Sequence, residues 1–182
     1  MKIIQFGLGR WGKNHNRILK ELDCDIKGFD IEADYHNVLD KIKPDGVVIT
    51  TSTVNHYPIA LECMFRNIPV FVEKPIMLKK SQLQSLGVWI QEYPKILFMA
   101  GHQLMYLPEI QPLVGKVGYL NANRNGAIPR TEGSLFSLMV HDIAVAHYVM
   151  DVENFEVEWA EGNRHEVKAM LRSEKKIAEL YA

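Results

Sequence analysis

The sequence lacks the features that mark disulfide-stapled and membrane-spanning proteins. Its 182 residues include only two cysteines, Cys24 and Cys63, which is too few for a disulfide framework. No stretch is apolar for long enough to cross a bilayer, and no basic-then-apolar leader precedes the first strand. We therefore expect no secretion signal and no membrane partner, and we predict a cytoplasmic protein.

An excess of charge of one sign is also missing. The formal net charge is −1, so there is no electrostatic reason to expect DNA, RNA or an acidic membrane as a partner. Hydrophobic residues make up 47% and charged residues 24%, the balance of a globular protein. Cys63 lies among apolar residues in ALECMF, so we predict a buried thiol rather than a nucleophile. No metal site is predicted.

Strand and helix patterns alternate through the first hundred residues. Strands are predicted at 2–6, 25–30, 46–50, 69–74 and 95–101, and helices at 12–22, 36–43, 55–66 and, capped by Ser81, up to Tyr93. This alternation predicts an α/β fold with a parallel sheet covered on both faces. We assign residues 1–100 to it as a Rossmann dinucleotide-binding domain.

The pattern changes after residue 101. A short helix is predicted at 108–115, a strand at 117–124 and a longer helix at 134–150. Residues 155–161 and 165–172 alternate as strands do, whereas 175–181 could be a strand or a frayed helix. We predict a small α+β domain over 101–182, with a helix on an open, mainly antiparallel sheet, that serves substrate binding and oligomerisation.

Three glycines follow the first strand in FGLGRWG. At this spacing Gly7 permits a tight turn, Gly9 lets the backbone approach a pyrophosphate, and Gly12 lets the helix pack on the strand. Asp30, 18 positions after Gly12, is placed to accept hydrogen bonds from the ribose of NAD. A tight turn with a solvated aspartate is the alternative. The predicted cofactor contacts here are Gly7, Leu8, Gly9, Arg10, Trp11, Gly12 and Asp30.

A second motif, Glu73-Lys74-Pro75 in PVFVEKPI, suggests a family. With the glycine turn and VVITTSTVNHYPIALECM, it resembles the glucose–fructose oxidoreductase, inositol dehydrogenase and MocA (Gfo/Idh/MocA) family. GHQLMYLPEI and GSLFSLMVHDIAVAHYVM are similar to the family's entry into the second domain and its substrate-site helix. The resemblance implies an NAD(P)-dependent oxidoreductase acting on a secondary hydroxyl of a sugar, sugar derivative or cyclic polyol.

The resemblance also implies roles for single residues. Lys74 matches the lysine that contacts the nicotinamide ribose and the substrate hydroxyl, and His141 matches the histidine that faces the reacting carbon. Both side chains suit proton transfer, although Lys74 could be an ordinary strand-end lysine and His141 a buried, hydrogen-bonded histidine. The Lys74–Pro75 bond is expected to be cis. Further cofactor contacts implied are Thr51, Ser52, His56 and Glu73, and weaker substrate candidates are His102, Tyr106, Asn123, Arg124 and Asp142.

The acidic residue at position 30 would repel a 2′-phosphate, so NAD is favoured over NADP, although Arg10 keeps NADP open. Asp142, next to His141, could orient the imidazole or face water.

Three features depart from the family pattern. Ser137 stands where relatives commonly have an aspartate one turn before the histidine, which leaves a non-catalytic NAD- or sugar-sensing protein as the alternative function. The interval from Asp30 to Pro44 is short, so the sheet is expected to lose a strand. The chain ends at Ala182, so the second sheet is expected to have about four strands and an exposed apolar face. We therefore predict a homodimer or homotetramer through that face, while a fragment of a longer enzyme would also fit.

Overall fold

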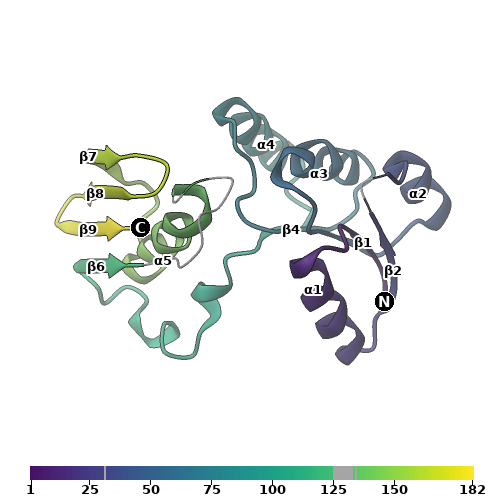
Figure 1. Cartoon of the computed structure of the whole chain (residues 1–182), viewed down its shortest axis with the longest axis horizontal. Helices are drawn as coiled ribbons and strands as arrows, with labels where there is room; N and C mark the ends of the chain where they lie inside the picture. The colour runs from purple at the N-terminus through teal and green to yellow at the C-terminus, as the bar shows by residue number, and fades with distance from the viewer. Residues whose placement is uncertain (31, 125–132, 134) are drawn as a thin grey trace. The chain divides into compact units, whose positions relative to one another are not determined.

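A computed structural model describes residues 1–30, 32–124, 133 and 135–182, apart from the side chains of Phe136 and Ser137. These residues form two compact units, Met1–Gly101 and His102–Ala182, each with its own sheet (Figure 1). Each sheet positions the candidate residues of its own unit.

The first unit contains five parallel strands in the order β2-β1-β3-β4-β5, as the alternating pattern predicts. The strands are β1 (Lys2–Phe6), β2 (Asp25–Phe29), β3 (Gly46–Ile49), β4 (Val70–Val72) and β5 (Phe98–Ala100). The helices are α1 (Arg10–Glu21), α2 (Tyr35–Ile42), α3 (His56–Phe65) and α4 (Lys80–Glu92), with a 3₁₀ turn η1 (Thr53–Asn55). In Figure 1, α1 lies on one side of this sheet and α3 and α4 lie on the other.

The core of the first unit follows from the apolar strands. Alternate residues of β1, β3 and β4 pack with Leu39 of α2 and with Ile59 and Cys63 of α3. Cys63 is fully buried, and burial raises the pKa of its thiol to about 12. The prediction of a buried thiol is therefore confirmed.

The short interval after β2 has the expected consequence. Residues 32–44 contain α2 and no strand, and β2 forms the edge of the sheet. This is the dinucleotide-binding strand order 3-2-1-4-5-6 without its outermost strand. The predicted cap of α4 is wrong, because the helix begins at Lys80 with Lys79 in the cap position and Ser81 inside the first turn.

The second unit contains a four-stranded sheet of order β6-β9-β8-β7, in which β6 and β9 are parallel and the other pairs antiparallel. Its strands are β6 (Tyr119–Asn123), β7 (Glu156–Gly162), β8 (Val167–Ser173) and β9 (Lys176–Tyr181), so the last segment is a strand and not a helix. The predicted helix at 108–115 is only a 3₁₀ turn, η3 (Gln111–Leu113), preceded by η2 (Gln103–Tyr106). The longer helix begins as a π-turn, η4 (Leu135–Met139), and continues as α5 (Val140–Met150).

Helix α5 covers one face of this second sheet. Ala146, Val149 and Met150 pack against alternate residues of β8 and β9, which include Leu171 and Leu180. The opposite face carries apolar side chains, including the half-buried Met170 and Ile177, among polar ones, so the apolar face that the sequence predicts is present only in part. On that face Tyr119 and Trp159 stand beside charged and polar side chains that alternate with the buried ones: Asn121, Glu179, Lys168 and Arg172.

No helix within the described ranges has the length and apolar content to cross a membrane.

Candidate cofactor and active site

Each glycine of the turn between β1 and α1 is there for a different physical reason. Gly7 has φ +97°, and a side chain there would lie 2.5 Å from the Thr50 carbonyl. A Cβ at Gly12 would clash with the carbonyl oxygen of Gly7, so glycine is needed for α1 to approach β1. Gly9 differs, because a Cβ there would meet no atom within 4 Å. Among the residues that the structure describes, no contact requires glycine at residue 9, whereas a phosphate lying against the start of α1 would.

A buried glutamine supports this turn. The side chain of Gln5 is fully buried, and its Nε2 donates to the carbonyl oxygens of Gly7 (3.0 Å) and Gly12 (2.7 Å). Thr50 Oγ1 also donates to Gly7 O (2.8 Å), and Asn16 Nδ2 donates to Gln5 Oε1 (3.3 Å). Sequence reasoning missed Gln5, although a glutamine inside an apolar strand was the signal, because a buried amide needs partners.

The parallel strands bring the predicted cofactor residues of the first unit to one edge. Phe6 of β1 pairs with Phe29 of β2 and Ile49 of β3, and Ile49 pairs with Val72 of β4. The residues that follow these strands therefore meet at the carboxyl edge. They are Gly7 to Gly12, Asp30, Thr51 with Ser52, and Glu73 with Lys74. The strand order reverses at β1, and open α/β sheets bind ligands at such a point.

Residues Leu8, Arg10 and Trp11 surround the start of α1 and are exposed. Leu8 packs over β2, because a Cβ at Gly28 would lie 2.7 Å from its side chain. Trp11 keeps 45% of its surface exposed. This part of the edge thus offers apolar surface beside the polar turn.

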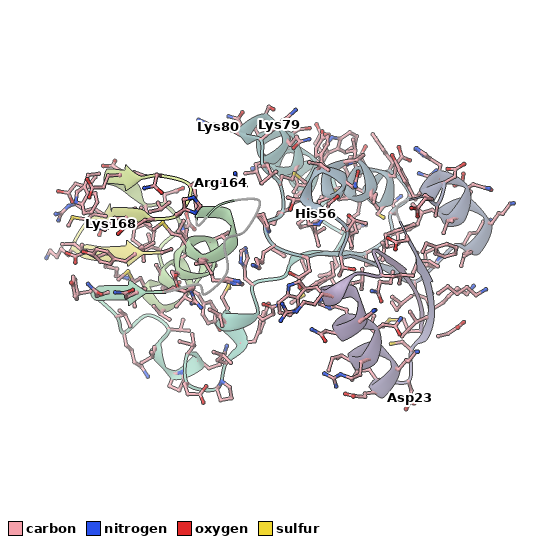
Figure 2. All side chains as sticks on the ribbon, viewed as in Figure 1. Asp23, His56, Lys79, Lys80, Arg164 and Lys168 are labelled. Carbon is pink, nitrogen blue, oxygen red and sulfur yellow. The ribbon has the colours of Figure 1, made fainter. Side chains whose placement is uncertain are left out.

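His56 is buried at the start of α3, where Figure 2 labels it. Its Nδ1 lies 3.0 Å from Pro75 O and 3.2 Å from Ile76 O, and its Nε2 lies 3.1 Å from Thr51 O. The ring therefore ties the loop after β3 to the turn after β4. The Lys74–Pro75 bond is cis, as the resemblance implied.

Glu73 is 4% exposed, and both of its carboxylate oxygens contact groups of the chain. Oε1 lies 2.7 Å from Nε2 of His15, a residue of α1, and Oε2 accepts the Lys74 backbone N–H at 3.0 Å. Lys74 itself is half-buried. His15 was not predicted, because its partner is far away in the sequence and no local pattern marks it.

In the second unit, two predicted substrate residues bind each other. Asp142 is 5% exposed and accepts from Arg124 Nε at 3.1 and 3.2 Å and from Arg124 Nη2 at 2.6 Å. These hydrogen bonds raise the pKa of Arg124. Asp142 therefore neither faces water nor lies free beside His141, which precedes it in the first turn of α5 and is half-buried. The side chain of Ser137 lies outside the described residues.

The remaining candidates of the second unit are dispersed. Asn123 ends β6 on the sheet face opposite α5, because Leu120 and Ala122 take the α5 side. Tyr106 ends η2 and is 59% exposed. His102 lines a cavity of about 530 Å³, and His141 is not among its lining residues.

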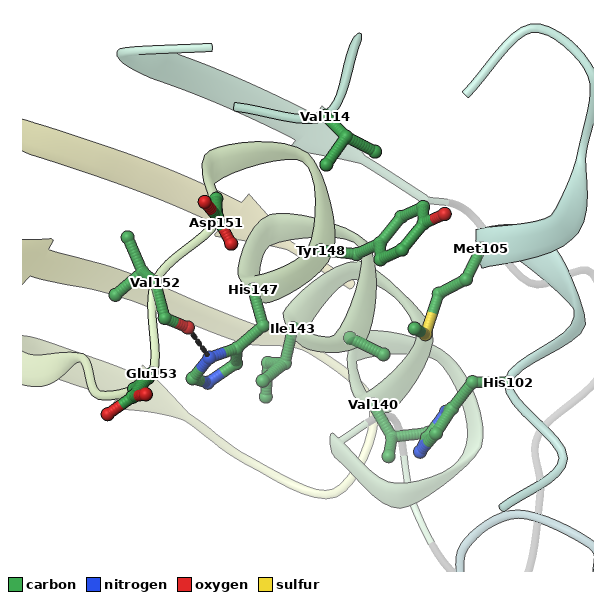
Figure 3. Close-up of a pocket in the computed structure, with 11 residues that line it drawn as sticks. His102, Met105, Val114, Val140, Ile143, His147, Tyr148, Asp151, Val152 and Glu153 are labelled. Atoms are coloured by element: carbon green, nitrogen blue, oxygen red, sulfur yellow. Dashed lines mark hydrogen bonds between the residues drawn. The ribbon is translucent and has the colours of Figure 1, made fainter. Parts of the chain in front are cut away.

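This cavity lies against the face of α5 that includes Val140, Ile143 and His147 (Figure 3). It is mostly apolar, with Met105 of η2 on the opposite wall. Nδ1 of His147 donates to Val152 O at 2.8 Å, drawn as a dashed line in Figure 3. Of the predicted substrate residues, the structure places only His102 here.

Comparison with known proteins agrees with this fold. A family model described as "Oxidoreductase family, NAD-binding Rossmann fold" (GFO_IDH_MocA) matches residues 13–102, about half of the chain. The chain belongs to the Gfo/Idh/MocA oxidoreductase family. Its first unit is accordingly an NAD-binding Rossmann domain, and the resemblance inferred from the sequence is confirmed. A comparison with curated protein sequences gave no significant match.

Solved structures are similar over the whole chain of this Gfo/Idh/MocA protein. UDP-N-acetylglucosamine 3-dehydrogenase GnnA from Acidithiobacillus ferrooxidans has a TM-score of 0.80 and 20% identity, over 100% of this chain and 66% of that one. Apo scyllo-inositol dehydrogenase from Lactobacillus casei gives 0.76 and 19%, over 100% and 68%. GenD2 from gentamicin A biosynthesis, in complex with NAD, gives 0.79 and 14%, over 100% and 65%. At these identities the likeness shows the fold, and the chain spans about two thirds of each relative.

Proposed function

We propose that this Gfo/Idh/MocA protein is an NAD(P)-dependent dehydrogenase that interconverts a secondary hydroxyl and a ketone on a sugar, sugar derivative or cyclic polyol. The observation that carries the proposal is the shared carboxyl edge of the first unit. Three segments follow neighbouring strands there: the turn with open space at Gly9, the Thr51–Ser52 loop and the Lys74 turn. Structural relatives that act on a nucleotide sugar and on an inositol support the substrate class.

The glycine turn and the acidic end of β2 hold the cofactor in this proposal. The unpaired N–H groups at the start of α1 bind the pyrophosphate, and Asp30 accepts hydrogen bonds from the adenosine ribose. A carboxylate at this position repels a 2′-phosphate, so NAD is the preferred form. When bound, NAD supplies the acceptor for the hydride.

In this proposal Lys74 and His141 transfer the proton. Oxidation of a secondary alcohol removes a hydride from carbon and a proton from oxygen, so a base must take the proton. Lys74 follows a buried strand, and its amine in the neutral form can accept it, as can the imidazole of His141. In the reverse direction the same groups return the proton to the new alkoxide.

A direct test titrates NAD and NADP into the protein and then screens sugars, nucleotide sugars and inositols for absorbance at the reduced-nicotinamide band. The proposal expects saturable NAD binding and turnover with at least one member of these classes. NAD binding with no turnover over the whole panel would contradict it.

That second result would favour the other candidate, a non-catalytic sensor of NAD or sugar. The observation in its favour is Ser137, because serine cannot serve as the carboxylate partner of a catalytic histidine. A sensor would bind NAD, and a sugar would change its affinity for NAD without chemical change.

We also propose a homodimer or homotetramer through the sheet face opposite α5. Tyr119, which is 57% exposed, and Trp159, which is 37% exposed, lie on this face among charged side chains. Exposed aromatic side chains are enriched at interface cores, and charged groups are found at the polar rim. Sedimentation at micromolar concentration tests it, and a monomer there would contradict it.

A further inference from the structure

Glu73 precedes Lys74, and its contacts suggest a role for a residue of α1. We propose that His15 is a positioning residue that acts through Glu73 to fix the backbone of Lys74 and thereby the direction of its amine. The inference rests on the proposed function, because that function makes Lys74 catalytic.

The geometry forms a continuous chain of contacts from α1 to Lys74. The His15 ring packs against Phe71 of β4, with ring centres 5.1 Å apart, and this packing fixes the ring plane. Its Nε2 then lies 2.7 Å from Glu73 Oε1, while Glu73 Oε2 accepts the Lys74 N–H at 3.0 Å. One carboxylate thus joins the imidazole to the backbone of the proposed catalytic residue.

Glu73 has little room to move. A Cβ on Gly101, the residue after β5, would lie 3.3 Å from the Glu73 side chain, so the chain encloses the carboxylate on that side. The side chain of Glu73 is 6% exposed and that of His15 21% exposed, so the imidazole is the more accessible member of the pair. A carboxylate so deeply buried is costly without a donor. Removing the imidazole should therefore displace the Glu73 carboxylate, and this displacement alters the acceptor of the Lys74 N–H.

His15 and His56 hold different parts of the same turn. His56 contacts the carbonyl oxygens of Pro75 and Ile76, after Lys74, whereas His15 acts before Lys74 through Glu73. The backbone of Lys74 is thus supported from both sides, and only His15 acts through a carboxylate.

The first unit also offers a matched control. Nδ1 of His36 lies 3.1 Å from Glu62 Oε2, an imidazole–carboxylate pair that joins α2 and α3. This pair has side chains 51% and 23% exposed and has no contact with the Lys74 turn among the interactions described. His36→Ala therefore removes an imidazole–carboxylate contact from another place, where Glu62 keeps Arg66 as a donor.

The experiment compares His15→Ala, His15→Gln and His36→Ala in the full chain. It measures kcat, KM for NAD, and hydrogen exchange of the Lys74 amide by NMR with ¹⁵N-lysine. We expect His15→Ala to lower kcat roughly tenfold to a hundredfold with little change in KM, as a small misplacement of a reacting group does. The Lys74 amide should exchange about tenfold faster, because its acceptor is disturbed. The glutamine amide can still donate to Glu73, so His15→Gln should restore both values to within about threefold, and His36→Ala should alter neither.

Two results would overturn the inference. One is that His15→Ala keeps the kcat of the wild type and the same rate of hydrogen exchange at the Lys74 amide. The other is a loss in His15→Gln as large as in His15→Ala, which would mean that ring packing on Phe71 matters rather than the hydrogen bond. If His15→Ala does not fold, Glu73→Gln replaces it, and unchanged Lys74 exchange there counts against the inference. If the wild-type protein shows no turnover, the proposed function fails, while the exchange measurements still decide the role of His15.

Discussion

In the first unit, residues far apart in the sequence meet at one edge, whereas in the second unit adjacent residues are separated. Gly9, Thr51 and Lys74 follow parallel neighbouring strands and so reach the same edge. Asn123 and Arg124 are consecutive, yet strand alternation places Asn123 on the face opposite α5, while Arg124 pairs with Asp142 of α5. In a parallel sheet, the residues that follow neighbouring strands lie at the same edge. In a sheet with one covered face, successive residues of a strand point to opposite faces, so neighbours in the sequence are separated.

The largest expected effect tests whether chemistry depends on the gathered edge. Lys74→Ala should lower kcat by about a hundredfold to ten-thousandfold with NAD affinity largely kept, because the proposed proton-transfer group is lost. Absorbance of reduced nicotinamide measures turnover. The control is Lys79→Ala, an exposed lysine just before α4 (Figure 2), which should leave turnover unchanged. Equal activity in the two variants would remove Lys74 from the mechanism.

The next prediction separates structural from ligand-binding glycines at this edge. Gly12→Ala forces α1 away from Gly7 and should lower the free energy of unfolding by about 1–3 kcal/mol and weaken NAD binding. At Gly9 the added methyl group of Gly9→Ala meets open space, so the free energy of unfolding should change by less than about 1 kcal/mol. NAD affinity should fall about tenfold or more. Urea unfolding and calorimetric titration measure the two quantities. Full NAD affinity in Gly9→Ala would argue against a pyrophosphate at this turn.

A third prediction concerns the pair that holds β6 to α5. Arg124→Ala leaves the buried Asp142 without its partner and should cost about 2–4 kcal/mol of stability. The matched control, Arg172→Ala, breaks a pair with Glu158 whose side chains are 43% and 41% exposed, and should cost less than about 1 kcal/mol. Urea unfolding compares them. Similar losses would show that the Arg124–Asp142 pair contributes no more than a surface ion pair.

The smallest expected effect is that the buried thiol of Cys63, in the core of the first unit, is not alkylated. Burial raises the pKa of Cys63 to about 12, so the native thiol becomes a thiolate only as pH rises towards that value. At pH 8, iodoacetamide should therefore modify the half-buried Cys24 and not Cys63, whereas both should react in urea. Mass spectrometry assigns the sites. Native labelling of Cys63 at the rate of Cys24 would contradict its burial.

Sequence patterns predicted the first unit well because its information is local. Apolar strands followed by turns and helices define β1 to β5, and the glycine spacing marks the turn after β1. Predictions were weaker where local patterns compete. Residues 108–115 look helical but form only a 3₁₀ turn, and 175–181 fitted two structures until pairing with β8 and β6 made it a strand.

The pairings of polar side chains could not be predicted. His15 with Glu73, Gln5 with the glycine turn, and His56 with the Pro75 turn join segments that no sequence period relates. The sequence suggests that Asp142 orients His141 or faces water. Its partner is Arg124, the residue that follows β6. Such partners depend on three-dimensional neighbours, so sequence can name the residues without naming their contacts.

By itself, the sequence determined the order of strands and helices, the glycine turn and the family, because backbone preferences and apolar periodicity act over a few residues. Only the tertiary structure decided which polar groups are buried together and which face each strand residue takes. The physical reason is that a buried charge or amide must find a partner wherever packing places one, and packing is a property of the whole fold.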